Sequence, residues 1–194
     1  MLQVGIYADD LTGALDAAAP FARVGMRAYV SLVGTAPAGL SDLYQVCSLN
    51  IDSRRAGQFA PFERASRAAR ELRAAGASIL VDKLDSTARG HFGMEARGAL
   101  SPEPSDPMEP RGSGEWHGPR VALLAPAYPA MRRSVSGGVL YVDGRQVTET
   151  DVGRDALTPV HSSDLREVVL QNVGVRPRLF TIEEVRDPGR MLEG

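Results

Sequence analysis

The chain has 194 residues, enough for one hydrophobic core of ordinary size and too few for two comfortable domains. Hydrophobic residues make up 43% and charged residues 24%, and the formal net charge of -2 gives no indication of a nucleic-acid or anionic-membrane partner. The start of the chain lacks the layout of a signal peptide, and the single cysteine, Cys47, excludes an internal disulfide. We therefore expect a cytoplasmic protein that forms a single domain over residues 1–194.

Apolar strands and helices alternate along the first part of the chain. Strands are expected at residues 3–7, 27–33, 43–49, 79–84 and 121–125. Helices are expected at residues 13–24, 61–75 and 90–100. Thr12 is the expected N-cap of the first helix, which Gly25 would end. This order predicts an α/β fold in which helices flank an open, mainly parallel sheet.

Two later segments depart from this alternation. Residues 101–119, SPEPSDPMEPRGSGEWHGP, are rich in proline and have no periodicity, which predicts a flexible, dispensable surface insertion. Residues 137–147, GGVLYVDGRQV, place Asp143 and Gly144 between two apolar runs, which predicts a β-hairpin. We expect this hairpin to elaborate the C-terminal third, and it need not belong to the main sheet.

Polar side chains follow three of the predicted strands. Asp9 and Asp10 come directly after the first strand, at the start of a helix, where open α/β sheets bind ligands and where anions are favoured. Two later loops each set an Asp-Ser pair beside an arginine: Asp52, Ser53 and Arg54 in one, and Asp85, Ser86, Thr87 and Arg89 in the other. Because strand ends of a parallel sheet converge, these groups could hold a small polyhydroxy acid. Helix capping and a structural ion-pair network are the alternatives.

A single lysine stands in the second of these loops. The chain has 22 lysine and arginine residues, of which only Lys83 is a lysine. One interpretation is chance in an arginine-biased composition. The other is that a compact ammonium group performs a task that a planar guanidinium cannot.

Several motifs occur in an order that resembles a known family. The segments ADDLTGALD, IDSR and KLDSTARGH, followed by one that runs from APAYPAMRRSVSGG to VHSSDL, resemble the N-terminal domain of the four-carbon acid sugar kinases. The resemblance covers nearly the whole chain apart from residues 101–119. It implies ATP-dependent phosphorylation of a hydroxyl group on an acid such as erythronate, threonate or a 3-oxo-tetronate. In that family the N-terminal domain holds the acid, and a C-terminal domain supplies most of the nucleotide site.

The resemblance also suggests roles for individual residues. It implies that Asp10 is the carboxylate near the attacking hydroxyl, with Asp85 as the alternative. The other residues expected to bind substrate are Asp9, Thr12, Gly13, Asp52, Ser53, Arg54, Lys83, Ser86, Thr87, Arg89 and Gly90. No metal-binding residue is expected in this chain. Asp82 and His91 stand where the resemblance suggests lysine and asparagine, which leaves the choice of acid open.

The sequence contains neither G-x-x-x-x-G-K-[ST] nor a G-x-G-x-x-G after a strand. We therefore expect the nucleotide-binding domain to be absent, so that ATP and Mg²⁺ bind only the complete kinase and the isolated chain is inactive. The missing domain would be a partner, and assembly into a homo-oligomer is left open. A non-catalytic acid-sugar-binding remnant is the main alternative. A haloacid-dehalogenase-like phosphatase is less favoured, because Asp10 and Thr12 fit its D-x-D-x-T motif but Ala8 occupies the nucleophile position.

The variant Lys83→Arg is expected to weaken the binding of an acid sugar although the formal charge is unchanged. The reason is that a point-like ammonium on a flexible stem would be replaced by a planar fork. Calorimetric titration of both proteins with a four-carbon sugar acid measures the difference. Equal affinities would reduce the lone lysine to an accident of composition.

Overall fold

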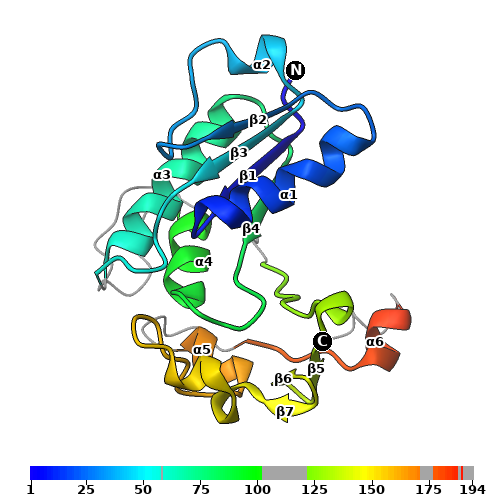
Figure 1. Ribbon diagram of the computed structural model, residues 1–194. Helices are drawn as coiled ribbons and strands as arrows, with labels where there is room; N and C mark the ends of the chain where they lie inside the picture. The colour runs from blue at the N-terminus through cyan, green and yellow to red at the C-terminus, as the bar shows by residue number, and fades with distance from the viewer. Residues whose placement is uncertain (58, 102–121, 171–176, 188, 190–194) are drawn as a thin grey trace.

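The computed structural model describes residues 1–57, 59–101, 122–170, 177–187 and 189 (Figure 1). Its strands are β1 (Val4–Ala8), β2 (Ala28–Ser31), β3 (Val46–Asn50), β4 (Ile79–Lys83), β5 (Arg133–Ser136), β6 (Val139–Val142) and β7 (Arg145–Gln146). Its α-helices are α1 (Leu11–Arg23), α2 (Leu40–Leu43), α3 (Ala60–Ala74), α4 (Phe92–Leu100), α5 (Leu165–Leu170) and α6 (Ile182–Arg186). Three 3-10 turns are η1 (Pro129–Met131), η2 (Val147–Glu149) and η3 (Asp151–Arg154). Within this part of the chain no helix has the length and apolar character needed to cross a membrane.

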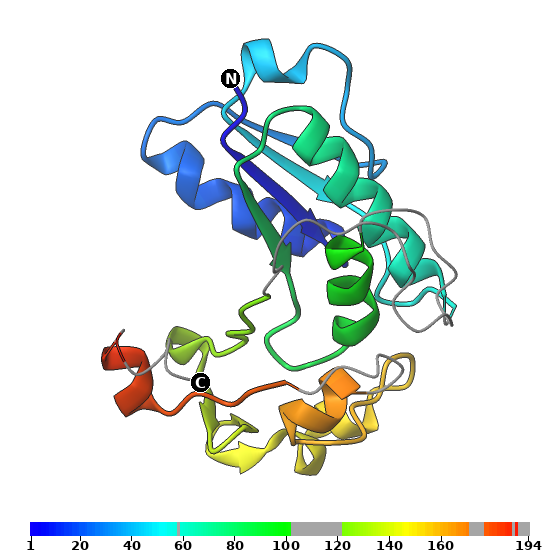
Figure 2. The ribbon, with the colours of Figure 1, turned by 180° about the vertical axis from the view of Figure 1, so that it is seen from behind.

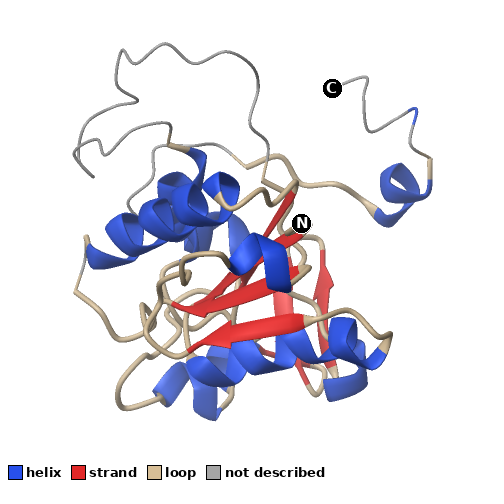
Figure 3. Ribbon diagram, turned by 90° about the horizontal axis from the view of Figure 1, so that it is seen from above, coloured by secondary structure: helices blue, strands red, loops and turns tan. Residues whose placement is uncertain are grey.

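The main sheet has four parallel strands in the order β2-β3-β1-β4. Helix α1 covers one face, and α3 and α4 lie on the other (Figures 1 and 3). Side chains of β1 alternate between these faces, so that Val4 and Ile6 pack with Phe21 of α1 while Tyr7 packs with Leu72 of α3. This arrangement confirms the predicted open parallel sheet flanked by helices.

The chain reverses its winding direction between β1 and β3. These two strands are neighbours in the sheet, yet β1 leads into α1 on one face and β3 leads into α3 on the other. Such a reversal separates the two loops and leaves room for a ligand at the carboxyl edge of the sheet. The loop after β4 lies beside them because β4 pairs with the other side of β1.

The second, antiparallel sheet has the order β5-β6-β7 and lies beyond the carboxyl edge of the first (Figure 1). The turn between β6 and β7 places Asp143 and Gly144 at φ values of 51° and 76°, which confirms the predicted hairpin. Leu140 of β6 shares a core with Phe92 of α4 and Leu165 of α5. We call residues 128–170, which contain this sheet and α5, the smaller unit. Figure 2 shows the loop after β4 running toward the smaller unit before α4 begins.

Two sequence predictions are wrong. Residues 122–125 form no strand: the segment pairs with no described strand, and Leu123 is 75% exposed. Thr12 is not the N-cap of α1, because the helix begins at Leu11 and the side chain of Asp10 accepts the N–H of Gly13 at 2.6 Å. The expected insertion at 101–119 lies, apart from residue 101, outside the described residues.

Helices α3 and α4 touch at a glycine. A Cβ atom added to Gly98 would lie 2.3 Å from the carbonyl oxygen of Phe62, which belongs to the backbone of α3. The variant Gly98→Ala should therefore lower the free energy of unfolding by about 1–3 kcal/mol, although alanine is the better helix former. Urea unfolding measures the change. Gly57→Ala is the matched control, because no atom lies within 4 Å of its added Cβ, and an equal effect of both variants would contradict this account.

Candidate functional site

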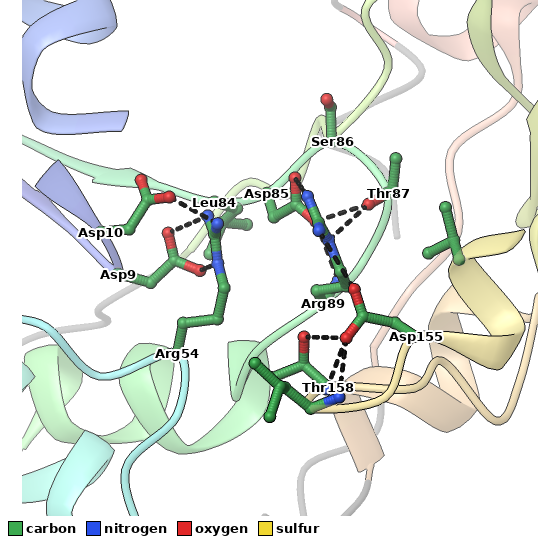
Figure 4. Close-up of polar contacts among 12 residues, drawn as sticks. Asp9, Asp10, Arg54, Leu84, Asp85, Ser86, Thr87, Arg89, Asp155 and Thr158 are labelled. Atoms are coloured by element: carbon green, nitrogen blue, oxygen red, sulfur yellow. Dashed lines mark hydrogen bonds and ion pairs between the residues drawn. The ribbon is translucent and has the colours of Figure 1, made fainter. Parts of the chain in front are cut away.

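Arg54 holds the two aspartates that follow β1. Its Nε and Nη2 atoms donate to the carboxylate of Asp9 at 2.7 and 2.8 Å, and Nη1 donates to Asp10 at 2.5 Å (Figure 4). The backbone N–H of Arg54 also donates to the carbonyl of Asp9 at 3.2 Å. One guanidinium thus closes the loop after β3 onto the loop after β1, and one residue links both predicted motifs.

The electrostatics of this pair depend on burial. Asp9 is 1% exposed, and burial raises the pKa of its carboxyl group while the bonds from Arg54 oppose that rise. Burial also disfavours the Arg54 cation, but the bonds and charges of Asp9, Asp85 and Asp10 raise its pKa overall. The arginine therefore stays charged. The Asp10 side chain is 30% exposed, so it is the more accessible of the two carboxylates.

Asp85 organises a second cluster after β4. Its Oδ2 atom accepts Thr87 Oγ1 at 2.5 Å and Arg89 Nε at 2.6 Å. Burial alone would raise the pKa of Asp85, but the bonds and charge of these partners lower it overall. Arg89 also lies 3.5 Å from Asp155, whose Oδ1 accepts the backbone N–H of Thr158 at 2.9 Å (Figure 4). Arg89 consequently ties the main sheet to the smaller unit.

At two glycines the backbone comes close to the side chains of Asp9 and Asp10. Gly90 has a φ of +109°, and a Cβ atom on it would lie 3.1 Å from Oδ2 of Asp9. A Cβ atom on Gly13 would lie 2.9 Å from Oδ1 of Asp10 and 3.4 Å from Cγ of Lys83. The ammonium group of Lys83 donates to the carbonyl of Leu84 at 2.8 Å. Lys83 and Asp10 therefore lie on the α1 side of the sheet, while Asp9 lies on the other.

Several expected substrate-binding residues lie outside these contacts. The Asp52 side chain is 84% exposed and its carboxylate lies 3.9 Å from Arg64 of α3. Thr12 is exposed on α1. Ser53 is fully buried and its hydroxyl donates to Glu95 at 2.5 Å. Ser86 accepts a bond from Arg133 of β5 at 2.5 Å.

Glu95, Asp82 and Arg133 are polar residues of this region that sequence reasoning missed as site residues. Glu95 is 0% exposed, and burial, with the nearby charge of Asp9, raises the pKa of its carboxyl group to about 7. Its spacing from Phe92 and Ala99 puts it on the buried face of α4. A glutamate on the apolar face of a predicted helix is unusual, and this is the sequence signal that could have identified Glu95.

A cavity of about 340 Å³ adjoins the clusters. Arg54, Gly90 and His91 line it from the main sheet, and the loop with Thr158 and His161 lines it from the smaller unit. A larger cavity of about 690 Å³ lies on the α3 side, beside Asp52 and Arg64, and shares no residue with the Asp9 and Asp10 contacts. The smaller one has the volume of a small-molecule site and combines cations with hydroxyl-bonding groups. Among the described residues, no group of three or more His, Cys, Asp or Glu could hold a metal ion.

The variant Arg54→Met is expected to destabilise the protein by about 3–5 kcal/mol at neutral pH, because it leaves Asp9 buried without its cation. The folded-state pKa of Asp9 is already raised, so the folded state binds more protons than the unfolded state and stability falls as pH rises through that pKa. Removing Arg54 should steepen this fall. Denaturant unfolding at about pH 5 and about pH 8 measures both effects.

Arg67→Met on α3 is the control, since the side chain is 50% exposed and lies 3.9 Å from Glu71. It should cost little at either pH. If Arg54→Met lowers the free energy of unfolding by no more than the control does, the arginine does not hold the site together.

Comparisons with known proteins give a consistent result. A family model described as a sugar-binding N-terminal domain matches residues 4–193. The D-threonate kinase of Bordetella bronchiseptica is 37% identical over 172 residues, which cover 84% of this chain and 38% of that protein. The D-erythronate kinase of Heliobacterium modesticaldum is 31% identical over 87% of this chain and 36% of that protein.

A crystal structure from Bordetella bronchiseptica, described as a domain of unknown function with bound citrate in a domain-swapped dimer, has a TM-score of 0.72 at 33% identity. The match covers 86% of this chain and 39% of that one, so the chain spans about two-fifths of the length of these relatives. The motif resemblance to the N-terminal domain of the four-carbon acid sugar kinases is thereby confirmed, and the chain belongs to the family of sugar-binding N-terminal domains.

Proposed function

We propose that this chain is the acid-binding half of an ATP-dependent kinase that phosphorylates a hydroxyl group of a four-carbon sugar acid. The observation that carries the proposal is the Arg54 bridge between Asp9 and Asp10, at the winding reversal of the sheet and beside a cavity of about 340 Å³. Two relatives are named for D-threonate and D-erythronate, which are four-carbon hydroxy acids. Citrate, the ligand of a related structure, is also a hydroxylated carboxylic acid.

Different roles follow from the exposure and pairing of the charged groups. Asp9 is buried and takes two bonds from Arg54, so we assign it to holding the arginine. Asp10 is accessible, so we assign it to the hydroxyl that attacks the phosphoryl group, with Asp85 as the alternative. Lys83 forms no ion pair with any described residue, so its charge is available to attract the acid's carboxylate.

Phosphoryl transfer depends mainly on positioning and on cations near the transferred group. ATP with Mg²⁺ supplies that group in the complete kinase. In this proposal the chain acts as a single domain, and a C-terminal domain provides most of the nucleotide site as a partner. Assembly of copies, which the domain-swapped relative makes worth testing, and a cytoplasmic location stay predictions.

A non-catalytic acid-sugar binder would use the same contacts without any transfer. The phosphatase alternative has a specific observation against it, since Ala8 is fully buried at the end of β1 and offers no nucleophile before Asp10. The experiment that follows separates the kinase half from the simple binder.

The isolated chain should bind D-threonate or D-erythronate weakly while neither hydrolysing ATP nor phosphorylating the acid. Transfer requires both substrates to be held in line within one water-poor site. Adding the C-terminal domain of a related kinase, in trans or fused, should restore activity, and Asp10→Asn should lower the restored kcat by about 100-fold or more. Calorimetry and a coupled ADP assay measure the two steps.

Asp16→Asn is the matched control, because Asp16 is an exposed acid on the same helix and its loss should leave activity unchanged. Turnover by the purified chain alone would contradict the missing-half proposal. Acid binding without turnover in the presence of the added domain would favour the binder, and failure to bind any such acid would contradict both.

A further inference from the structure

A second set of acidic groups lies behind the Asp9–Arg54 pair, on the α3 and α4 face of the sheet. Tyr7 of β1 and Asp9, which directly follows this strand, lie two residues apart on this face, and Asp82 of β4 is paired in register with Tyr7. Glu95 of α4 lies near enough for its charge to raise the pKa values of Tyr7 and Asp82, and its Oε1 atom accepts the hydroxyl of Ser53. Tyr7, Asp82 and Glu95 are held by regular strands and a helix rather than by exposed loops.

Two carboxyl oxygens of this set are buried without a partner. Neither Oδ1 of Asp82 nor Oε2 of Glu95 accepts a hydrogen bond from any described residue. A buried carboxylate oxygen without a donor is costly, and a proton on one of the carboxyl groups removes the charge that makes it so. The charge of Glu95 is the largest influence on the pKa of Asp82 after burial, and both effects raise it. Two such neighbours resist ionising together.

The surrounding charges do not replace that proton. From the loop after β1, Asp9 raises the pKa values of Glu95 and Asp82 further. From the loop after β3, Arg54 opposes this, but it is already bonded to both Asp9 and Asp10. A hydrogen bond with Tyr7 of β1 lowers the pKa of Asp82, Lys83 of β4 lowers it less, and Arg73 of α3 acts on Tyr7. The carboxyl groups therefore outnumber the cations that reach them.

We propose that Asp82 and Glu95 share a single proton at neutral pH, and that this proton limits the negative charge directly behind Asp9 and Arg54. The proton comes from solvent and resides on one or the other of the two carboxyl groups, so no other bond forms or breaks. On the proposed function, on which this consequence rests, an incoming sugar acid adds negative charge to the site. By linkage, binding of the acid raises the fraction of molecules that carry the proton, and the acid binds more tightly as pH falls.

The first test needs no ligand. In the 194-residue chain, side-chain carboxyl signals of Asp82 and Glu95 followed by NMR should titrate together, in one step well above the ordinary carboxyl range. Glu95→Gln should remove that step and lower the midpoint of Asp82, because its acidic neighbour is gone. Glu63→Gln, the same change at an exposed position of α3, should leave the step in place. Independent titration of both groups below about pH 5 would overturn the proposal.

Asp82→Asn provides a second route if Glu95→Gln does not fold, and it should remove the shared step equally. The second test is calorimetry with D-threonate in buffers of different ionisation heat. Wild-type chain should take up a fraction of a proton on binding near pH 7, and Glu95→Gln should take up less. Binding without proton uptake would overturn the linkage to the acid. Failure of either protein to bind D-threonate would instead contradict the proposed function, while the NMR titration still decides whether the proton is shared.

Discussion

The contact on which the candidate site depends is the bridge from Arg54 to Asp9 and Asp10. It fixes the loop after β3 against the loop after β1 with both side-chain and backbone bonds. Asp9 can be buried at the sheet edge only because this cation accompanies it, since a lone buried carboxylate would take up a proton or force the loops apart. The same contact leaves Asp10 partly exposed at the start of α1, so that one carboxylate is structural and its neighbour is accessible.

The cations near this bridge differ in whether a carboxylate already neutralises them. Arg54 and Arg89 are each committed to carboxylates of the chain itself, whereas Lys83, among the residues that the structure describes, bonds to a carbonyl group and to no carboxylate. In the proposed site, an anionic ligand would therefore meet the ammonium group of Lys83 and two guanidinium groups for which it must compete with those carboxylates. Proton binding by Asp82 and Glu95 would ease that competition by removing a negative charge without introducing another cation. The candidate site is thus a balance of charges rather than a row of separate binding residues.

The sequence predicts the main sheet and its helices because apolar periodicity is strong from β1 to α4. It also predicts that the polar loops meet, since parallel strands bring their ends together. It does not predict the partners within the site: Arg54, expected to face an anion, bonds to the two aspartates, and Asp52 in the same motif points to solvent. Glu95 was missed because a single acid on a helix is usually solvated. Residues 122–125 are apolar like a strand, but composition cannot say whether a neighbouring strand is available for pairing.

The bridge also has a consequence for the order of events in folding. Arg54 and Asp9 are 45 residues apart in the chain, and their contact requires β3 to have paired with β1. Contacts between such distant segments form only after the entropy of closing the intervening loop has been overcome. A molecule that binds at this bridge therefore recognises the completed native state and no earlier collapsed form. Its stabilising effect should appear as slower unfolding, with the rate of folding left almost unchanged.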